Sequence, residues 1–154
     1  MTRRALANGD PVAKAVQPDI LDQSVGYQVR RVQLANFRGF AQHVRRPQAT
    51  PTQFTMLVLI EANPGMSQVE LGAMLDMDRA TTMTVVDKLE SRKWVVRKRS
   101  TVDRRKHELH LSPQGKTALD AMKKAVDEHE DAFGSRLTQR EKSELLRLLK
   151  KLWP

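Results

Sequence analysis

The sequence predicts a mainly α (α+β) protein built around a winged helix-turn-helix. Two observations carry this prediction. Helical periodicity with capping residues recurs along most of the chain, and the segment 78–111 combines one helical pattern with two short strand patterns around a basic turn. Between Lys88 and Lys106 nine Lys or Arg residues stand against two acidic ones, so this segment holds most of the net charge of +9.

The composition favours a small protein with an acidic partner. A chain of 154 residues is expected to form one compact domain or half of an obligate dimer. Because the positive charge is clustered in the predicted hairpin, nucleic acid is favoured over a membrane surface. The chain has no cysteine, which excludes disulfides and thiol-based sensing. With no signal-peptide or spanning pattern, we expect a cytoplasmic protein and no membrane partner.

The N-terminal part is predicted to hold two segments. Residues 1–18 contain Asn8-Gly9 and two prolines with little hydrophobic period, which indicates a flexible N-terminal arm. Residues 19–48 form the next predicted segment, in which a helical period begins at about Ser24 and Pro47 ends it. Their apolar surface is broader than one stripe, which favours an N-terminal dimerisation helix.

Residues 49–111 are predicted to form the DNA-binding lobe. Thr50 with Gln53 is a capping box before an apolar core helix that stops near Asn63. A second capping box at Ser67 opens a short helix, with Val69, Leu71 and Leu75 expected to face inward. A turn over 76–78 leads into a recognition helix from Arg79, followed by the basic hairpin.

Residues 112–154 are predicted to form C-terminal dimerisation helices. Ser112-Pro113 begins one helix, and Thr138 with Glu141 is a third capping box that begins the last one. The last helix is rich in leucine, which favours pairing between two subunits. The alternative is that these leucines complete the core of a monomer.

The recognition helix has two distinct faces at 100° per residue. Thr82, Val85, Val86 and Leu89 fall on the inward face. The outward face and its flanks are mostly short and polar; they consist of Arg79, Ala80, Thr81, Met83, Thr84, Asp87 and Lys88. Short side chains let a helix approach base edges in the major groove. A solvated helix surface is the alternative, and the adjacent basic hairpin favours DNA.

These residues resemble the MarR (multiple antibiotic resistance regulator) family of winged-helix transcription factors. The matching motifs lie between Thr50 and Gly115 and are T-P-x-Q-F, Q-x-E-L-G, D-R-A-T-T-M-T-V-V-D-K-L-E, D-R-R and L-S-P-Q-G. The resemblance implies a bacterial, nucleoid-associated homodimer that binds a palindromic operator in double-stranded DNA. It also implies that Asp103 braces the wing, Arg104 contacts a phosphate and Arg105 enters the minor groove. The expected DNA-binding residues are Ser67, Gln68, Arg79, Ala80, Thr81, Met83, Thr84, Lys88, Arg99, Asp103, Arg104 and Arg105.

The chain departs from the family pattern at two positions. Thr84 stands where the family often has an arginine on the recognition face, so the base preference is not carried over. Lys93 stands where a glycine commonly follows the helix, and a left-handed backbone there would cost a non-glycine residue about 1 kcal/mol.

The resemblance also implies a small effector, commonly an aromatic acid, that releases the DNA. The G-Y-Q-V-R-R and D-R-A-T-T segments are most similar to regulators of aromatic-compound catabolism, including nicotinate and benzoate-type pathways. An aromatic carboxylate needs a cation and apolar walls, which are offered by Tyr27, Arg30, Arg31, Phe37, Phe40 and His43. The alternative is that Phe37 is a core residue, the arginines are solvated or paired, and His43 lies on the surface.

Metal sites and catalysis find little support in the sequence. His107 and His110 are expected on opposite faces of one strand, and the segment around His129, between two glutamates, indicates a solvated helix surface. There is no phosphate-binding glycine loop and no nucleophile motif, so no cofactor, no metal and no enzyme activity are expected. The predicted function is a dimeric repressor of a catabolic or efflux operon, released by a small aromatic carboxylic acid. The alternative is an architectural nucleic-acid-binding module without an effector.

Overall fold

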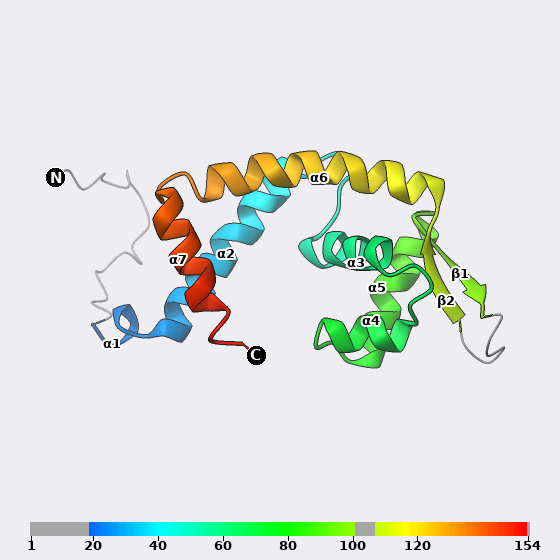
Figure 1. The fold of residues 1–154 in the computed structure, drawn as a ribbon, viewed down its shortest axis with the longest axis horizontal. Helices are drawn as coiled ribbons and strands as arrows, with labels where there is room; N and C mark the ends of the chain where they lie inside the picture. The colour runs from blue at the N-terminus through cyan, green and yellow to red at the C-terminus, as the bar shows by residue number, and fades with distance from the viewer. Residues whose placement is uncertain (1–18, 101–106, 154) are drawn as a thin grey trace, which may run out of the picture. The chain divides into compact units, whose positions relative to one another are not determined.

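The computed structural model describes residues 19–100 and 107–153, and the predicted arm, residues 1–18, lies outside this description. The chain divides into two compact units, Met1–Ala35 and Asn36–Pro154, which are described separately. Helices predominate among the described residues (Figure 1). The elements are α1 (Asp19–Asp22), α2 (Val25–His43), α3 (Pro51–Ala62), α4 (Gln68–Met74), α5 (Arg79–Ser91), β1 (Val95–Arg99), β2 (His107–Leu111), α6 (Pro113–Phe133) and α7 (Gln139–Leu149).

The segment 19–48 contains the short helix α1 before the long helix α2, whose start at Val25 agrees with the helical period predicted from about Ser24. Ser24 separates α1 from α2, and its hydroxyl oxygen accepts a hydrogen bond from the backbone N–H of Tyr27 at 3.3 Å. Such a cap satisfies an amide that the first turn of a helix leaves without a partner, so a new helix begins here. In the first unit, the apolar stripe of α2 is open, since Val25, Val29 and Val32 are 43–61% exposed.

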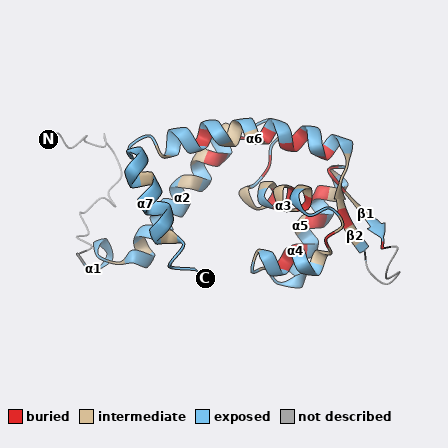
Figure 2. Ribbon diagram, viewed as in Figure 1, coloured by how far each residue is buried: buried red, intermediate tan, exposed pale blue. Residues whose placement is uncertain are grey.

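The second unit contains the hydrophobic core. Four helices and the hairpin contribute fully buried residues to it, and Figure 2 marks the positions of buried residues in red along the ribbon. These are Met56, Leu57 and Ile60 of α3, Leu71 of α4, Val86 and Leu89 of α5, Val95 and Leu109 of the strands, and Leu119 and Met122 of α6. Because α3 contributes on several sides, it is the central helix, as its nearly uniform apolar character predicted.

Side-chain caps fix where the helices begin. Thr50, Ser67 and Thr138 each form the predicted capping box with the residue three positions later. One prediction for α4 was wrong, because Val69 is 70% exposed although Leu71 is fully buried. Residues two apart on a helix point about 200° apart, so both cannot face the same core.

The β1–β2 hairpin is anchored to the loop before α4. The two strands pair antiparallel, with Val95 opposite Leu111 and Arg99 opposite His107. Leu109 is fully buried, its N–H donates to the Met66 carbonyl at 2.8 Å, and its own carbonyl accepts from Gly65 N–H at 3.0 Å. The base of the hairpin is therefore held by backbone bonds and a core side chain. The turn residues 101–106 lie outside the description.

The start of α6 lies in close backbone contact with Trp94, between α5 and β1. Ser112 caps α6, and its N–H donates to the Trp94 carbonyl at 3.0 Å. This contact leaves no room at Gly115, where an added Cβ would lie 1.9 Å from the same carbonyl oxygen. Further along, Glu61 of α3 pairs with Lys116 and Lys123 of α6. Close backbone contact and ion pairs together hold α6 on the lobe.

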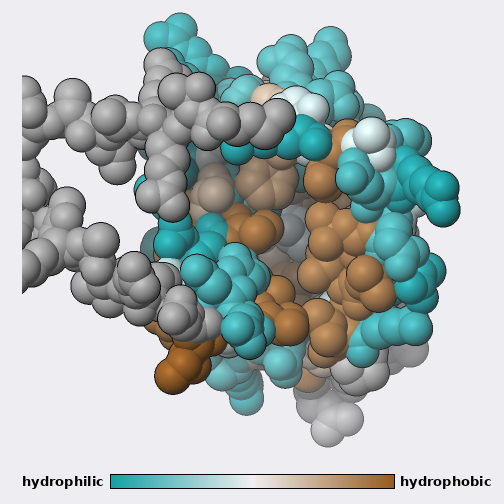
Figure 3. Space-filling model, turned by 90° about the vertical axis from the view of Figure 1, so that its left-hand side faces the viewer, coloured by the Kyte–Doolittle hydropathy of each residue, from teal (hydrophilic) through white to brown (hydrophobic). Residues whose placement is uncertain are grey.

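The C-terminal helix keeps its apolar side chains open to solvent. All of α7 is described, and it has no buried residue. Leu145, Leu146 and Leu148 are 42–54% exposed, followed by Leu152 and Trp153 at 61% and 69%. Figure 3 shows apolar side chains, in brown, that no hydrophilic group covers. Among the described residues, no helix has the length and apolar character needed to cross a bilayer.

Replacing Lys93 with glycine is expected to raise the free energy of unfolding by about 1 kcal/mol. Lys93 has a φ of 59°, the left-handed conformation that glycine adopts without steric cost. Lys93 is also the position at which this sequence lacks the glycine that is common in the family pattern. Urea unfolding followed by circular dichroism measures the change. A Lys93→Gly variant that is less stable than the parent protein would show that the lysine side chain contributes more than its backbone strain costs.

Candidate nucleic-acid interface

Helix α5 presents the two faces that the sequence predicted. Thr82, Val86 and Leu89 are buried against the lobe, and the residues of the opposite face are exposed. Asp78 caps the helix by accepting the Thr81 N–H at 2.8 Å. Hydrogen bonds from the Thr81 hydroxyl and N–H also lower the pKa of Asp78 below its ordinary value of 3.8. The exposed face is thus carried by a helix with a fixed start.

The exposed threonines of α5 use their hydroxyl protons within the helix. The Thr81 hydroxyl donates to Asp78 at 2.6 Å, and the Thr84 hydroxyl donates to the Ala80 carbonyl at 3.0 Å. Each of them therefore offers a partner a methyl group and oxygen lone pairs, but no free proton. Such groups suit a thymine methyl or an exocyclic amine on a base edge.

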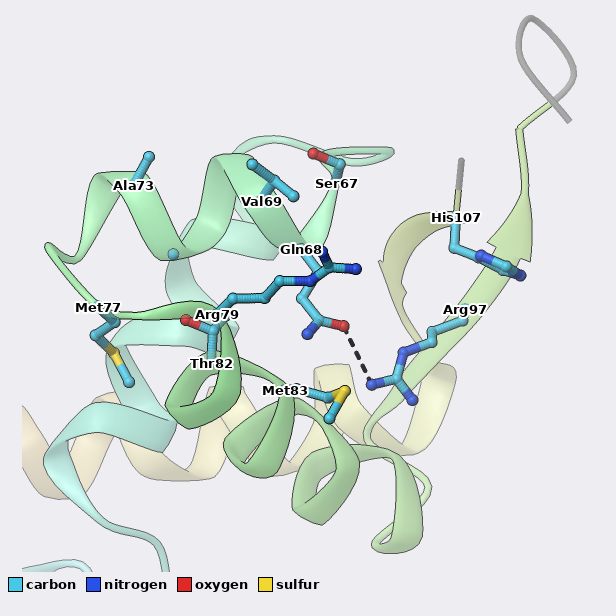
Figure 4. Close-up of a pocket in the computed structure, with 11 residues that line it drawn as sticks. Ser67, Gln68, Val69, Ala73, Met77, Arg79, Thr82, Met83, Arg97 and His107 are labelled. Carbon is cyan, nitrogen blue, oxygen red and sulfur yellow. Dashed lines mark hydrogen bonds between the residues drawn. The ribbon is translucent and has the colours of Figure 1, made fainter. Parts of the chain in front are cut away.

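A hollow of about 610 Å³ lies between α4, α5 and the hairpin (Figure 4). It brings together four of the residues predicted from the sequence, namely Ser67, Gln68, Arg79 and Met83. It also contains residues that the sequence reasoning had not selected; these are Val69, Gly72, Ala73, Met77, Thr82, Arg97 and His107. The exposed position of Val69 follows from the helical period, whereas Arg97 and His107 enter the hollow only through the path of the hairpin.

Arg97 forms polar contacts with three side chains around this hollow. Its guanidinium donates to Asp87 and Glu90 of α5 and to the Gln68 side chain of α4. Figure 4 shows the bond to Gln68. The sequence signal was an acidic pair three residues apart on a helix followed by an arginine on the next strand.

The other predicted DNA-binding residues lie around the hollow or outside the description. Ala80, Thr81, Thr84 and Lys88 are exposed on α5, and Arg99 is exposed at the end of β1. Ser67 already accepts the Glu70 N–H as the cap of α4. The three residues of the wing turn, Asp103, Arg104 and Arg105, lie outside the described residues.

The predicted effector residues fall in both units of the chain. In the first unit, Arg31 donates to the Tyr27 hydroxyl at 2.9 Å and lies 5.7 Å from its ring centre, while Arg30 is exposed. In the second unit, Phe40 is buried in the core. The interpretation of Phe37 as a core residue was wrong, because it is 45% exposed. Phe37 continues the apolar period of α2, which favoured a core position, but no neighbouring element in the described part of the chain buries its side chain.

A buried histidine cluster joins α2 and α6, and the sequence reasoning missed it. His129 is 2% exposed, so its interpretation as part of a solvated surface was wrong. Its Nε2–H donates to Asn36 Oδ1 at 2.6 Å, and its ring centre lies 5.3 Å from that of His43. His43 is half-buried, with Nδ1–H donating to the Gly39 carbonyl at 2.9 Å. In the sequence, His129 stands three residues after Val126 and four before Phe133, and this helical period of apolar positions was the correct signal.

Lowering the pH from 8 to below 6.5 is expected to destabilise the chain through His129. Burial holds the pKa of this imidazole below its ordinary value of 6.5, with His43 lowering it and Glu130 raising it. Between the folded pKa and 6.5 the unfolded chain binds more protons, so the free energy of unfolding falls as the pH falls through that window. Urea midpoints at several pH values measure the slope.

His129→Gln is the matched variant for this pH dependence, because glutamine can still donate to Asn36 but does not titrate. We expect a shallower loss of stability with falling pH in this variant than in the parent protein. Identical pH profiles of the two proteins would contradict the assignment to His129.

Metal binding has no visible site in the described part of the chain. Among residues 19–100 and 107–153, no group of three or more His, Asp or Glu side chains is placed to hold a metal ion. The pair formed by His43 and His129 has no third ligand of this kind among them.

The fold and the exposed α5 with its neighbouring hairpin define a winged helix-turn-helix protein of the DNA-binding class. The sequence model described as "MarR family" matches residues 49–107. A putative transcriptional regulatory protein for the hcr operon of Thauera aromatica is 38% identical over 130 residues, which cover 84% of this chain and 78% of that protein. This chain therefore belongs to the MarR family and is a transcriptional regulator.

Two solved structures of the transcriptional repressor CouR are similar to this chain over most of their length. CouR bound to a 23-mer DNA duplex superposes with a TM-score of 0.84 at 37% identity, covering 87% of this chain and 95% of that chain. CouR bound to p-coumaroyl-CoA superposes with a TM-score of 0.83 at 34% identity, covering 89% and 96%. The fold of this chain is thus one that has been observed both with DNA and with an aromatic ligand.

Proposed function

We propose that this regulator is a dimeric repressor that binds a palindromic operator and is released by an aromatic effector. The observation that carries the proposal is the exposed face of α5, which lies beside the basic hairpin. Asp78 caps this helix, and its opposite face is buried in the hydrophobic core. A helix of this kind fits the major groove, and a cationic hairpin fits the phosphates or the minor groove. The similarity to CouR bound to DNA supports it.

Each predicted DNA-binding residue receives a role in this proposal. Arg79, Ala80, Thr81, Met83 and Thr84 face base edges in the major groove, where Thr84 offers a methyl group and lone pairs. Backbone phosphates are the partners of Ser67, Gln68, Lys88, Arg99 and Arg104. Asp103 braces the wing and Arg105 enters the minor groove, roles that rest on the family motif alone.

Dimerisation is proposed through the terminal helices. The leucines of α7 and the valines of α2 remain exposed, as expected when a second subunit covers them. Two copies of α5 would then read two half-sites about one helical turn of DNA apart.

The effector is proposed to be an aromatic carboxylic acid or its coenzyme A thioester. CouR has been solved with p-coumaroyl-CoA, an aromatic acyl thioester. In this chain, the candidate contacts are Tyr27, Arg30, Arg31, Phe37, Phe40 and His43. Aromatic rings and cations are the kinds of side chain that an aromatic group with a nearby negative charge needs. The name of the Thauera relative, which refers to an operon, supports control of a gene cluster.

DNA binding with and without effector tests the proposal. The full chain is titrated into labelled DNA from upstream of its own gene, and into shuffled DNA of equal length, at fixed salt. We expect preference for the upstream DNA by at least about 1,000-fold and release by an aromatic acid or its thioester. Weak preference without any ligand response would favour the alternative, an architectural module that binds mainly phosphates.

A further inference from the structure

Arg97 ties three elements of the DNA-binding lobe together. It projects from β1, its Nη1 donates to Glu90, and its Nη2 donates to Asp87 at 2.5 Å and to Gln68 Oε1 at 3.3 Å. The Arg97 side chain is 22% exposed, against 55% for Asp87 and 41% for Glu90. One cation on the hairpin thus pairs with two partly exposed carboxylates of α5.

The position of Asp87 makes its ion pair with Arg97 important for DNA binding. Asp87 lies three residues after Thr84 and four after Met83, on the next turn of the exposed face of α5. An uncovered carboxylate at that position would face the phosphates on the wall of the groove that α5 enters. Like charges placed opposite each other at an interface oppose binding and lower the rate of encounter.

The hairpin has other attachments that do not depend on Arg97. Its base is held by the backbone bonds of Leu109 to Met66 and Gly65, and by the buried Val95 and Trp94. A partly exposed ion pair adds little to folding by comparison. The loss of Arg97 is therefore expected to leave the fold in place and to change mainly the charge that the lobe presents.

We propose that Arg97 is a positioning residue for DNA binding, which acts by neutralising Asp87 and Glu90 on the recognition helix. The proposal rests on the proposed function, because it assumes that α5 enters a DNA groove. While Arg97 is in place, the acidic pair Asp87 and Glu90 does not oppose DNA binding. When Arg97 is removed, the pair repels the DNA phosphates. Arg97 lines the hollow, and its guanidinium forms ion pairs with both carboxylates.

Three variants separate neutralisation from a direct DNA contact and from a mechanical brace. They are Arg97→Met, the double variant Asp87→Asn/Glu90→Gln, and the triple variant that combines all of these changes. Lys124→Met, at an exposed position of α6, is the control for losing one positive charge. The affinity of each full-length protein for the operator is measured at the same salt, and thermal unfolding is followed in parallel.

We expect Arg97→Met to weaken operator binding on the order of 10- to 100-fold, while Lys124→Met stays within about threefold of the parent protein. The triple variant should recover to within about threefold of the parent, since it leaves no uncovered carboxylate. The double variant, which keeps Arg97, should bind at least as tightly as the parent. This double variant tests the proposal even if Arg97→Met fails to fold.

Two results would overturn the proposal. A triple variant as weak as Arg97→Met would mean that Arg97 contacts DNA itself or braces the lobe mechanically. Weaker binding by the double variant would mean that the carboxylates assist binding. In both cases the parent protein still binds its operator, so the proposed function survives. If the parent protein shows no operator preference, the proposed function and the role of Arg97 fail together.

Discussion

Gly115→Ala is expected to lower the free energy of unfolding by about 3 kcal/mol or more, the largest stability change that we predict. The added Cβ would lie 1.9 Å from the Trp94 carbonyl oxygen and 2.7 Å from its carbon. These are backbone atoms, so no side-chain rotation relieves the clash. Neither partner moves easily, because Trp94 is buried and Ser112 binds both its carbonyl and that of Lys93.

Gly26→Ala is the matched control for this prediction. Gly26 also lies in a helix, but the nearest atom to an added Cβ there is the Ser24 hydroxyl oxygen at 4.0 Å. Alanine in an open helical position stabilises by about 0.5–1 kcal/mol relative to glycine. Urea unfolding of both variants measures the contrast. Equal stability of Gly115→Ala and the parent protein would show that the contact between α6 and Trp94 is looser than described.

Thr84→Glu is expected to weaken operator binding on the order of 100-fold or more, because like charges at an interface cost several kcal/mol. Thr84 is exposed in the middle of α5, so glutamate there would meet the phosphates or bases of the groove. Glutamate is a better helix former than threonine, so folding should not suffer. Fluorescence anisotropy with labelled operator measures the loss, and thermal unfolding checks the fold.

Thr117→Glu provides the same chemical change outside the proposed interface. Thr117 is exposed on α6, and its hydroxyl donates to the Pro113 carbonyl at 3.1 Å, as Thr84 does to Ala80. It adds the same charge to the chain, and operator binding should stay close to that of the parent protein. If both variants lose binding equally, the effect comes from net charge, and α5 has no special place in recognition.

Much of the fold was predictable because helix caps and helical periods depend on residues that are close together in the sequence. The caps at Thr50, Ser67 and Thr138 each act on an amide three residues away, so a short stretch of sequence contains both partners. The two faces of α5 follow from its helical period in the same way. For the candidate interface, Arg79 and Met83 were found through this period, and they lie together in the hollow beside Gln68.

The wrong predictions for His129 and Phe37 concern how distant parts of the chain pack, whereas the one for Val69 went against the helical period itself. His129 looked solvated between two glutamates, but it donates to Asn36, 93 residues earlier. Phe37 continued an apolar period, yet it is exposed. A local pattern states which face of a helix is apolar, but not what covers that face.

By itself, the sequence determined the fold class of this protein, a winged helix-turn-helix, since caps, periods and the basic hairpin all act over a few residues. Only the tertiary structure decided that Arg97 spans β1, α4 and α5, that His129 is buried, and that Gly115 touches Trp94. These contacts depend on how the helices and strands pack. Packing is fixed by the core as a whole, so no short stretch of sequence encodes it.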